Sequence, residues 1–299
     1  MWGVGRRPTT DGAGEWAGRR AWDAVRALWD HARRPTPNTL VALLAAPALH
    51  AQAPVRLELR PTPGDTIRMR VEQETEVLGQ RPGGEAPQRM MMAVRLWSRA
   101  VIEGRVRGGT SVLTITDSVR LTTTDPRAQE LAARTARALT GRAMRLRIGA
   151  DGTARVIGGE GEREISAVVS AMPAAFPAHA VSVGDHWRRE MPVPAAPAAA
   201  GADGVIRAVF RLDSLTRDGA LAWITVKGEM SGEAAMTGTV AGALVLDRRR
   251  GWLEDARFTL AVQTSVMARG TAGMPMQVVT RIRQHMRAEP ARGGRSTKP

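Results

Sequence analysis

The chain has 299 residues, 43% of them hydrophobic and 24% charged, which is enough to bury one substantial core. It contains no cysteine, and this excludes disulfides, thiolate metal ligands, a cysteine nucleophile and lipid attachment through a lipobox cysteine. No stretch reaches the roughly 18 apolar residues of a membrane-spanning helix, so we expect a chain that does not span a membrane.

The formal net charge of +14 invites a nucleic-acid interpretation, which the rest of the composition does not favour. The basic residues are nearly all arginine, and Lys227 and Lys298 are the only lysines. Together with abundant alanine and glycine, this is typical of a GC-rich genome. Binding of single strands also needs aromatic side chains among the charges, and only 4% of the residues are aromatic. We therefore expect no nucleic-acid partner, while anionic lipid or an envelope polymer stays a candidate.

Residues 1–53 have the pattern of a leader. A basic pair at positions 33 and 34 precedes the apolar run Leu40–Leu49, and an Ala-x-Ala sequence follows. This is the order of a secretory signal peptide, ending near Ala51 or Ala53. A buried helix is the alternative. Because the stretch before the basic pair is unusually long, we expect the true start codon to lie downstream of residue 24. The leader predicts export to the periplasm or the extracellular space.

Strict alternation begins after Val55. In Asp65–Val77, apolar residues and Thr75 share one face and Arg or Glu residues share the other, as in a half-buried strand. Similar runs follow at 94–102, 113–121, 206–212, 256–266 and 276–286. In the second of these we expect Leu113, Ile115, Val119 and Leu121 to share a face. Tight turns are expected at Gly108-Gly109, Asp151-Gly152, Asp218-Gly219 and Arg250-Gly251.

Two helices interrupt the strands. Asp125 is expected to cap the first helix, Pro126 to take its first position and Gly141 to end it. Its expected apolar stripe comprises Ala128, Leu131, Ala132, Thr135 and Leu139. A second helix is expected over 162–172, followed by a strand and then a Pro- and Ala-rich linker over 192–204.

These elements predict an α+β, mainly β fold. We expect one domain over residues 54–289, followed by a disordered tail over 290–299. Its centre is a long, antiparallel, strongly bent sheet, a half-barrel of about ten strands with about four strands before the first helix. The two short helices would occupy the concavity. Two smaller sheets that separate near 192–204 are the alternative.

The segment Phe176–Trp187 contains Phe176-Pro177, a short spacer and then Val-x-Val-Gly184-Asp185-x-Trp187. It resembles the signature of an uncharacterised family of secreted bacterial β-rich proteins, a domain of unknown function. The resemblance covers most of residues 55–289 and implies no known chemistry. The expected architecture also resembles the envelope lipoprotein-carrier fold. From the residues alone the motif is structural: Gly184 and Asp185 turn the chain, Val181 and Val183 share a face, and Trp187 enters the core.

Signatures of catalysis are missing from the sequence. It has no Gly-x-Ser-x-Gly elbow and no Walker motif. Asp185, His186 and Glu190 are close in sequence, but on a strand the first two point to opposite faces, which is poor geometry for a metal. Met90-Met91-Met92 alternates in the same way, and we expect core packing rather than a copper site. We expect no cofactor, no metal and no catalytic residue.

The predicted function is therefore non-enzymatic. We expect an exported cell-envelope protein that binds an apolar or lipid-like ligand on the concave face of the bent sheet, with arginines at its rim. The expected lining comprises Met69, Val71, Phe210, Phe258, Leu260, Met276 and Val278. An envelope scaffold that meets a protein partner through an Arg-rich face or through sheet edges is the alternative. A less favoured one is an envelope hydrolase.

Overall fold

The computed structural model describes residues 53–80, 88–159, 175–193, 204–232, 236–267 and 275–289, all within the compact unit Ala51–Pro299. These residues form β1 (Thr66–Gln80), β2 (Gln88–Val106), β3 (Gly109–Thr123), α2 (Pro126–Leu139), β4 (Ala143–Ile148), β5 (Ala154–Gly159), β6 (His186–Pro192), β7 (Gly204–Leu215), β8 (Leu221–Gly232), β9 (Thr237–Asp247), β10 (Trp252–Met267) and β11 (Pro275–Ala288). The predicted leader up to residue 52, the helix over 162–172, most of the 192–204 linker and the 290–299 tail lie outside the described residues.

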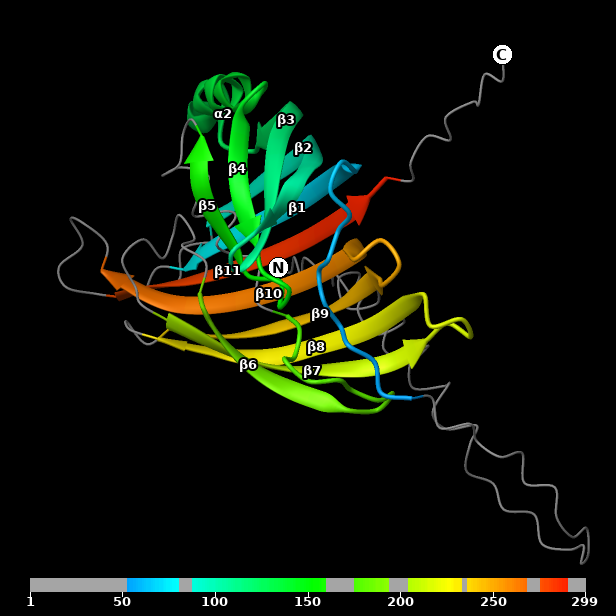
Figure 1. Cartoon of the computed structure of the whole chain (residues 1–299). Helices are drawn as coiled ribbons and strands as arrows, with labels where there is room; N and C mark the ends of the chain where they lie inside the picture. The colour runs from blue at the N-terminus through cyan, green and yellow to red at the C-terminus, as the bar shows by residue number, and fades with distance from the viewer. Residues whose placement is uncertain are drawn as a thin grey trace, which may run out of the picture. The chain divides into compact units, whose positions relative to one another are not determined.

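All eleven strands form one bent, open, antiparallel sheet (Figure 1). Its order is β5-β4-β3-β2-β1-β11-β10-β9-β8-β7-β6, so the first and last strands meet in the middle. The predicted single sheet is confirmed. The alternative of two sheets is wrong, because β6 and β7 pair up to Pro192 and Val205. Three strands, rather than about four, precede the first helix.

The two faces of the sheet differ sharply. On the inner, concave face the side chains are mostly apolar. Most charged residues lie on the outer face, at the strand positions that alternate with the apolar ones. In β7, for example, Ile206, Ala208, Phe210 and Leu212 are buried while the residues between them are exposed. The predicted alternation is confirmed in β1, β2, β7, β10 and β11 because their cross-strand registers align the apolar sets.

A β-bulge in β3 corrects one expected face. Trp97 pairs with Ser118 but the next residue, Ser98, pairs with Thr116, so Asp117 is an extra residue. The insertion reverses the alternation along β3. Val119 and Leu121 therefore lie on the inner face, and Leu113 and Ile115 lie on the outer face. The expectation that all four share a face is wrong.

Residues 53–65 form an N-terminal strap that crosses one end of the inner face (Figure 1). Backbone hydrogen bonds tie it to three separate places: Val55 N–H donates to Val181 (2.8 Å), Leu59 N–H to Ala150 (2.8 Å) and Arg60 N–H to Gly251 (2.9 Å). Gly251 has a φ of +60°, and a Cβ there would lie 2.4 Å from the Arg60 carbonyl oxygen. Only glycine fits this contact between the strap and the β9–β10 turn.

The first helix begins and ends where the sequence predicted. The Asp125 side chain accepts from Arg127 N–H at 2.9 Å, and the chain leaves the helix at Thr140. Its position differs from the prediction. Gly141 N–H donates to Thr116, so α2 runs beside the part of β3 that β4 does not pair, and not in the concavity. None of its residues is buried, and Leu131 of the expected stripe is 59% exposed.

The Phe176–Trp187 motif leads into β6, an edge strand of the sheet, and packs against its neighbour β7. Trp187 stacks on Phe210 with ring centroids 5.8 Å apart, and its Nε1 donates to the Ala175 carbonyl at 2.7 Å. The Asp185 carboxylate accepts from Ser182 N–H at 2.8 Å in a turn that gives Gly184 a φ of +96°. The predicted turn and the buried Trp187 are confirmed. Val181 is buried but Val183 is exposed, because the turn begins between them, so their expected common face is wrong.

Candidate functional site

The middle of the inner face is the candidate site. All seven expected lining residues lie on this face, in β1, β7, β10 and β11. Met69, Val71, Phe258, Leu260 and Met276 are half-buried, whereas Phe210 and Val278 are buried. Phe210 belongs to the packed core with Trp187. The half-buried residues therefore offer apolar surface, and the two buried ones support it.

The sheet register brings most of these residues together. Leu260 lies opposite Ile282, which lies opposite Thr75 in the next strand. Phe258 likewise lies opposite Gln284, which lies opposite Gln73. Two neighbouring rows of side chains, all half-buried except the buried Thr75, thus cross β10, β11 and β1. Phe210 is separated from Phe258 by Val226 and Gly242, and Met276 lies further along β11 beside Gly79.

Glycines on the inner face give this part of the sheet its shape. Gly242 faces Phe258, and a Cβ at Gly242 would lie 2.7 Å from the Phe258 ring. A Cβ at Gly228 would lie 3.0 Å from Val240 and closer still to the backbone of β7. Large side chains of neighbouring strands therefore lie over these glycines, a device that lets a sheet curve. The sequence analysis missed the role of Gly228 and Gly242, although the alternation places both glycines on the inner face.

The sequence analysis also missed Arg189. Among the buried and half-buried inner-face residues that the structure describes, it is the one charged side chain. The signal was present, because alternation from the buried Trp187 places Arg189 on the same face. Its guanidinium donates from Nη2 to the Phe176 carbonyl oxygen.

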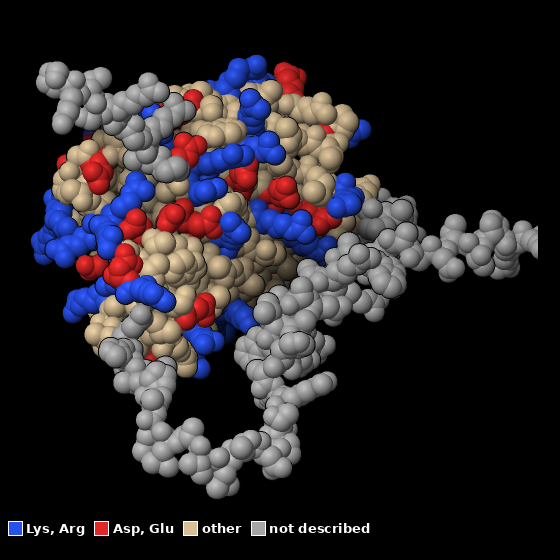
Figure 2. Space-filling model, turned by 90° about the vertical axis from the view of Figure 1, so that its right-hand side faces the viewer, with Lys and Arg blue, Asp and Glu red and all other residues tan. Residues whose placement is uncertain are grey.

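The outer face carries most of the charge, and its charges are largely paired across strands. Glu76 pairs with Arg89 at 2.7 Å and with Arg281 at 3.6 Å, and Glu74 pairs with Arg283 at 3.9 Å. Figure 2 shows one side of the molecule on which Lys and Arg side chains are interspersed with Asp and Glu. Such exposed pairs are typical of a solvated sheet surface.

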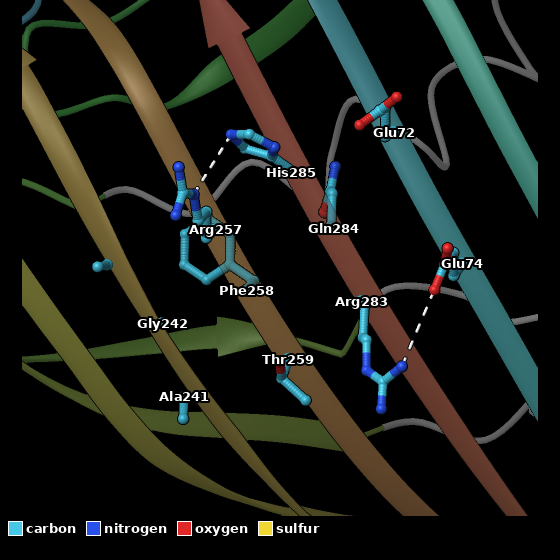
Figure 3. Close-up of a pocket in the computed structure, with 11 residues that line it drawn as sticks. Glu72, Glu74, Ala241, Gly242, Arg257, Phe258, Thr259, Arg283, Gln284 and His285 are labelled. Carbon is cyan, nitrogen blue, oxygen red and sulfur yellow. Dashed lines mark hydrogen bonds and ion pairs between the residues drawn. The ribbon is translucent and has the colours of Figure 1, made fainter. Parts of the chain in front are cut away.

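The outer face is hollowed over β9, β10, β11 and β1, in a depression of about 750 Å³ (Figure 3). Ala241 and Ala243 line it between charged side chains. His285 Nε2 lies 2.7 Å from an Asp255 carboxylate oxygen, and Arg257 Nε lies 3.1 Å from the other. The Asp255 carboxylate thus contacts both neighbouring side chains. The small residues Ala241, Gly242 and Ala243 line the depression beside these charged and imidazole side chains.

A carboxylate in β2 shows the clearest electrostatic effect. Hydrogen bonds from Arg145, with contacts of 2.7 and 2.8 Å, and then one from the Ser111 hydroxyl at 2.7 Å, hold the pKa of Glu103 below its usual range. The hydrogen bond from Arg70 lowers the pKa of Glu72 in the same way. The Glu103 contacts join β2, β3 and β4.

This lowered pKa predicts how stability depends on pH. Because the pKa of Glu103 is lower in the folded chain than in the unfolded one, its contribution is complete above about pH 5 and is lost as the pH falls through the folded-state pKa. The free energy of unfolding should therefore differ between wild type and Glu103→Gln at pH 7 and converge in acid, as urea unfolding at several pH values would measure. Glu130→Gln, at an exposed helical pair, is the control and should show no such convergence. A Glu103→Gln difference that is constant with pH would contradict the assignment.

The residues considered for a metal do not converge. Asp185 is used in its turn, Glu190 pairs with Arg207 at 3.0 Å, and His186 is exposed on the outer face of β6. In the ranges that the structure describes, no group of three or more His, Asp or Glu residues is placed to hold a metal ion. Within the same ranges, no helix has the length and apolar character to cross a membrane.

The three consecutive methionines follow the predicted alternation in β2. Met90 and Met92 pair with Val77 and Thr75 on the inner face, and Met91 pairs with Glu76 on the outer face. Met92 is half-buried and Met90 is exposed at the end of the strand. Met90 and Met92 thus extend the apolar inner surface next to the Thr75 row.

No family model matches the chain, and no curated protein matches it either. Solved structures show distant likeness. A structure titled for lipid–protein interactions in lipovitellin shares 10% identity and covers 77% of this chain and 26% of its own, with a TM-score of 0.45. DynF from the dynemicin biosynthesis pathway of Micromonospora chersina shares 10% identity and covers 85% and 94%, with a TM-score of 0.22. The transport unit of the autotransporter AIDA-I from Escherichia coli shares 8% and covers 83% and 93%, with a TM-score of 0.20. The chain spans about a quarter of the lipovitellin chain. Likeness at this level carries no conclusion.

Proposed function

We propose that the protein is a non-enzymatic, exported cell-envelope protein that binds an apolar or lipid-like ligand on the inner face of its sheet. The observation that carries the proposal is the contrast between the two faces. Met69, Val71, Phe258 and Leu260 are half-buried on the inner face, while the ion pairs lie on the outer face. Half-buried apolar side chains on a concave surface are the usual lining of a lipid-like ligand site.

The compartment is part of the same proposal. Its support is the leader pattern in residues 1–53, a basic pair followed by an apolar run and Ala-x-Ala. Membership of the uncharacterised secreted family is also a proposal, supported by the Phe176–Trp187 motif. The scaffold alternative has less support, because several outer-face arginines pair with neighbouring carboxylates.

The proposal is tested by native mass spectrometry of the protein purified gently from its own cells, followed by solvent extraction. We expect an added mass of a few hundred daltons that solvent releases, and a mature chain that begins near Gln52 or Pro54. The purified protein should also bind the methyl ester of cis-parinaric acid, a neutral fluorescent acyl probe.

Neighbouring substitutions locate the binding surface. Leu260→Arg places a charge on the inner face and should abolish binding of the ester, because an acyl chain cannot be buried against a charge. Thr259→Arg, one residue earlier on the exposed outer face, is the matched control and should bind normally. A wild-type protein that carries no extractable ligand and does not bind the ester would overturn the proposal.

A further inference from the structure

Arg189 is an unusual residue for its position. It lies on the inner face of β6 between Trp187 and Met191, where its neighbours across β7 are Phe210, Ala208 and Ile206. All three of those neighbours are buried. A half-buried cation on an apolar face costs free energy unless hydrogen bonds or a counterion compensate it.

The compensation within the protein is incomplete. The Nη2 atom donates to the Phe176 carbonyl oxygen, but the Nε atom is buried and has no hydrogen-bond partner. Among the described residues no carboxylate forms an ion pair with Arg189, whereas Arg207 in the next strand pairs with Glu190. A guanidinium has five N–H donors in a planar fork that matches a carboxylate or a phosphate. Arg189 therefore carries a charge that the described residues do not compensate, and an anion would compensate it.

We infer that Arg189 binds the anionic head group of an amphipathic ligand whose acyl chain lies on the inner face. This inference rests on the proposed function and specifies its ligand class: an acyl chain that ends in a carboxylate or a phosphate, rather than a neutral lipid. Phe176 positions the guanidinium through its carbonyl oxygen, so the segment before β6 holds the cation in place.

The register fits a head group at the edge and a chain toward the centre. Arg189 lies in the same cross-sheet row as Ala208, Gly228, Val240 and Leu260. Four strand spacings, about 19 Å along the sheet, separate β6 from β10. A long acyl chain has the length for this span. Ala208 and Val240 in the row are already buried, so the surface offered to the chain is at the half-buried Leu260 and Ile282.

The test compares two probes that differ only in charge, cis-parinaric acid and its methyl ester, by fluorescence titration. Arg189→Gln should weaken binding of the acid about ten- to a hundred-fold, the loss expected for a charge-assisted hydrogen bond, and should leave the ester unchanged. Arg189→Lys keeps the charge and should restore much of the affinity for the acid. Arg188→Gln removes an exposed arginine one residue away, on the outer face, and should alter neither probe.

The outcomes separate this inference from the proposed function. If wild type binds both probes and Arg189→Gln binds the acid as tightly as wild type does, the inference is wrong and the apolar site stands. If Arg189→Gln weakens acid and ester equally, Arg189 is structural and the inference is again wrong. If wild type binds neither probe, the proposed function itself fails. Alkyl phosphate in competition with the acid distinguishes phosphate from carboxylate as the preferred head group.

Discussion

Replacing Trp187 with alanine should lower the free energy of unfolding by about 3–5 kcal/mol, the range for deleting a large buried aromatic side chain. Trp187 is 6% exposed and stacks on Phe210, which is fully buried. The substitution removes this stacking, leaves a cavity beside Phe210 and deprives the Ala175 carbonyl of its donor. Since small domains are stable by about 5–15 kcal/mol, the loss is a large fraction of the total. Urea unfolding followed by circular dichroism measures it.

Two other substitutions make the Trp187 result specific. Trp223→Ala removes the same side chain where it is 37% exposed on the outer face of β8, and we expect a loss below about 1 kcal/mol. Trp187→Phe keeps a ring against Phe210 and loses the hydrogen bond from Nε1, which should cost about 1–3 kcal/mol. The role of Trp187 as the anchor of the β6 edge would be wrong if Trp187→Ala were no more destabilising than Trp223→Ala.

Leu57→Ala should lower the free energy of unfolding by about 2–5 kcal/mol. Leu57 is 2% exposed and lies in the N-terminal strap, between the hydrogen bonds of Val55 and Leu59. Because the strap contacts residues near 150, 181 and 251, a cavity beneath it weakens several junctions together. Thermal unfolding at a fixed protein concentration measures the effect.

The neighbouring residue Arg56 provides the matched control for the strap. Its side chain is exposed, so Arg56→Ala should change the free energy of unfolding by less than about 0.5 kcal/mol. Equal effects of the two substitutions would show that the strap does not contribute to the core. Loss of ligand binding in Leu57→Ala at a temperature where the protein stays folded would further place the strap beside the binding surface.

Much of the sheet could be predicted because its signal is simple. A strand that is apolar on one face and charged on the other has a period of two, and the run Asp65–Val77 shows it without interruption. The four glycine-containing turns were predicted for a similar reason, since few residues accept their backbone conformation. Gly108, Gly152, Gly219 and Gly251 all have positive φ in the structure.

The features that could not be predicted have no local signal. The bulge at Asp117 adds one residue to β3 without a glycine to mark it, so the faces after it were reversed. The strap alternates over residues 55–60 as a strand does, but nothing in it marks its partners, which are single backbone groups far away in sequence. The apolar stripe of α2 suggested burial, yet Leu131 faces solvent because the helix lies at the sheet edge.

In the candidate site, too, some features could be predicted from the sequence and others could not. The expected lining residues lie on the inner face as predicted, since alternation sorts them there. Which of them stay accessible was not predictable, because Phe210 is covered by Trp187, a residue 23 positions away in the sequence that β6–β7 pairing brings next to it. Arg189 escaped notice for a different reason: in a chain so rich in arginine, one more arginine carries little information until its neighbours are known.

The meeting of β1 and β11 in the middle of the sheet makes the fold depend on complete synthesis. Either half, β1–β5 or β6–β10, can form its hairpins from neighbours in sequence, but β11 must pair with both β1 and β10. Until the last strand has emerged from the ribosome, β1 and β10 each keep an unsatisfied edge. A premature stop before residue 275 would leave two half-sheets with no strand to join them, so truncated chains would be open to chaperones and proteases while finished ones would not.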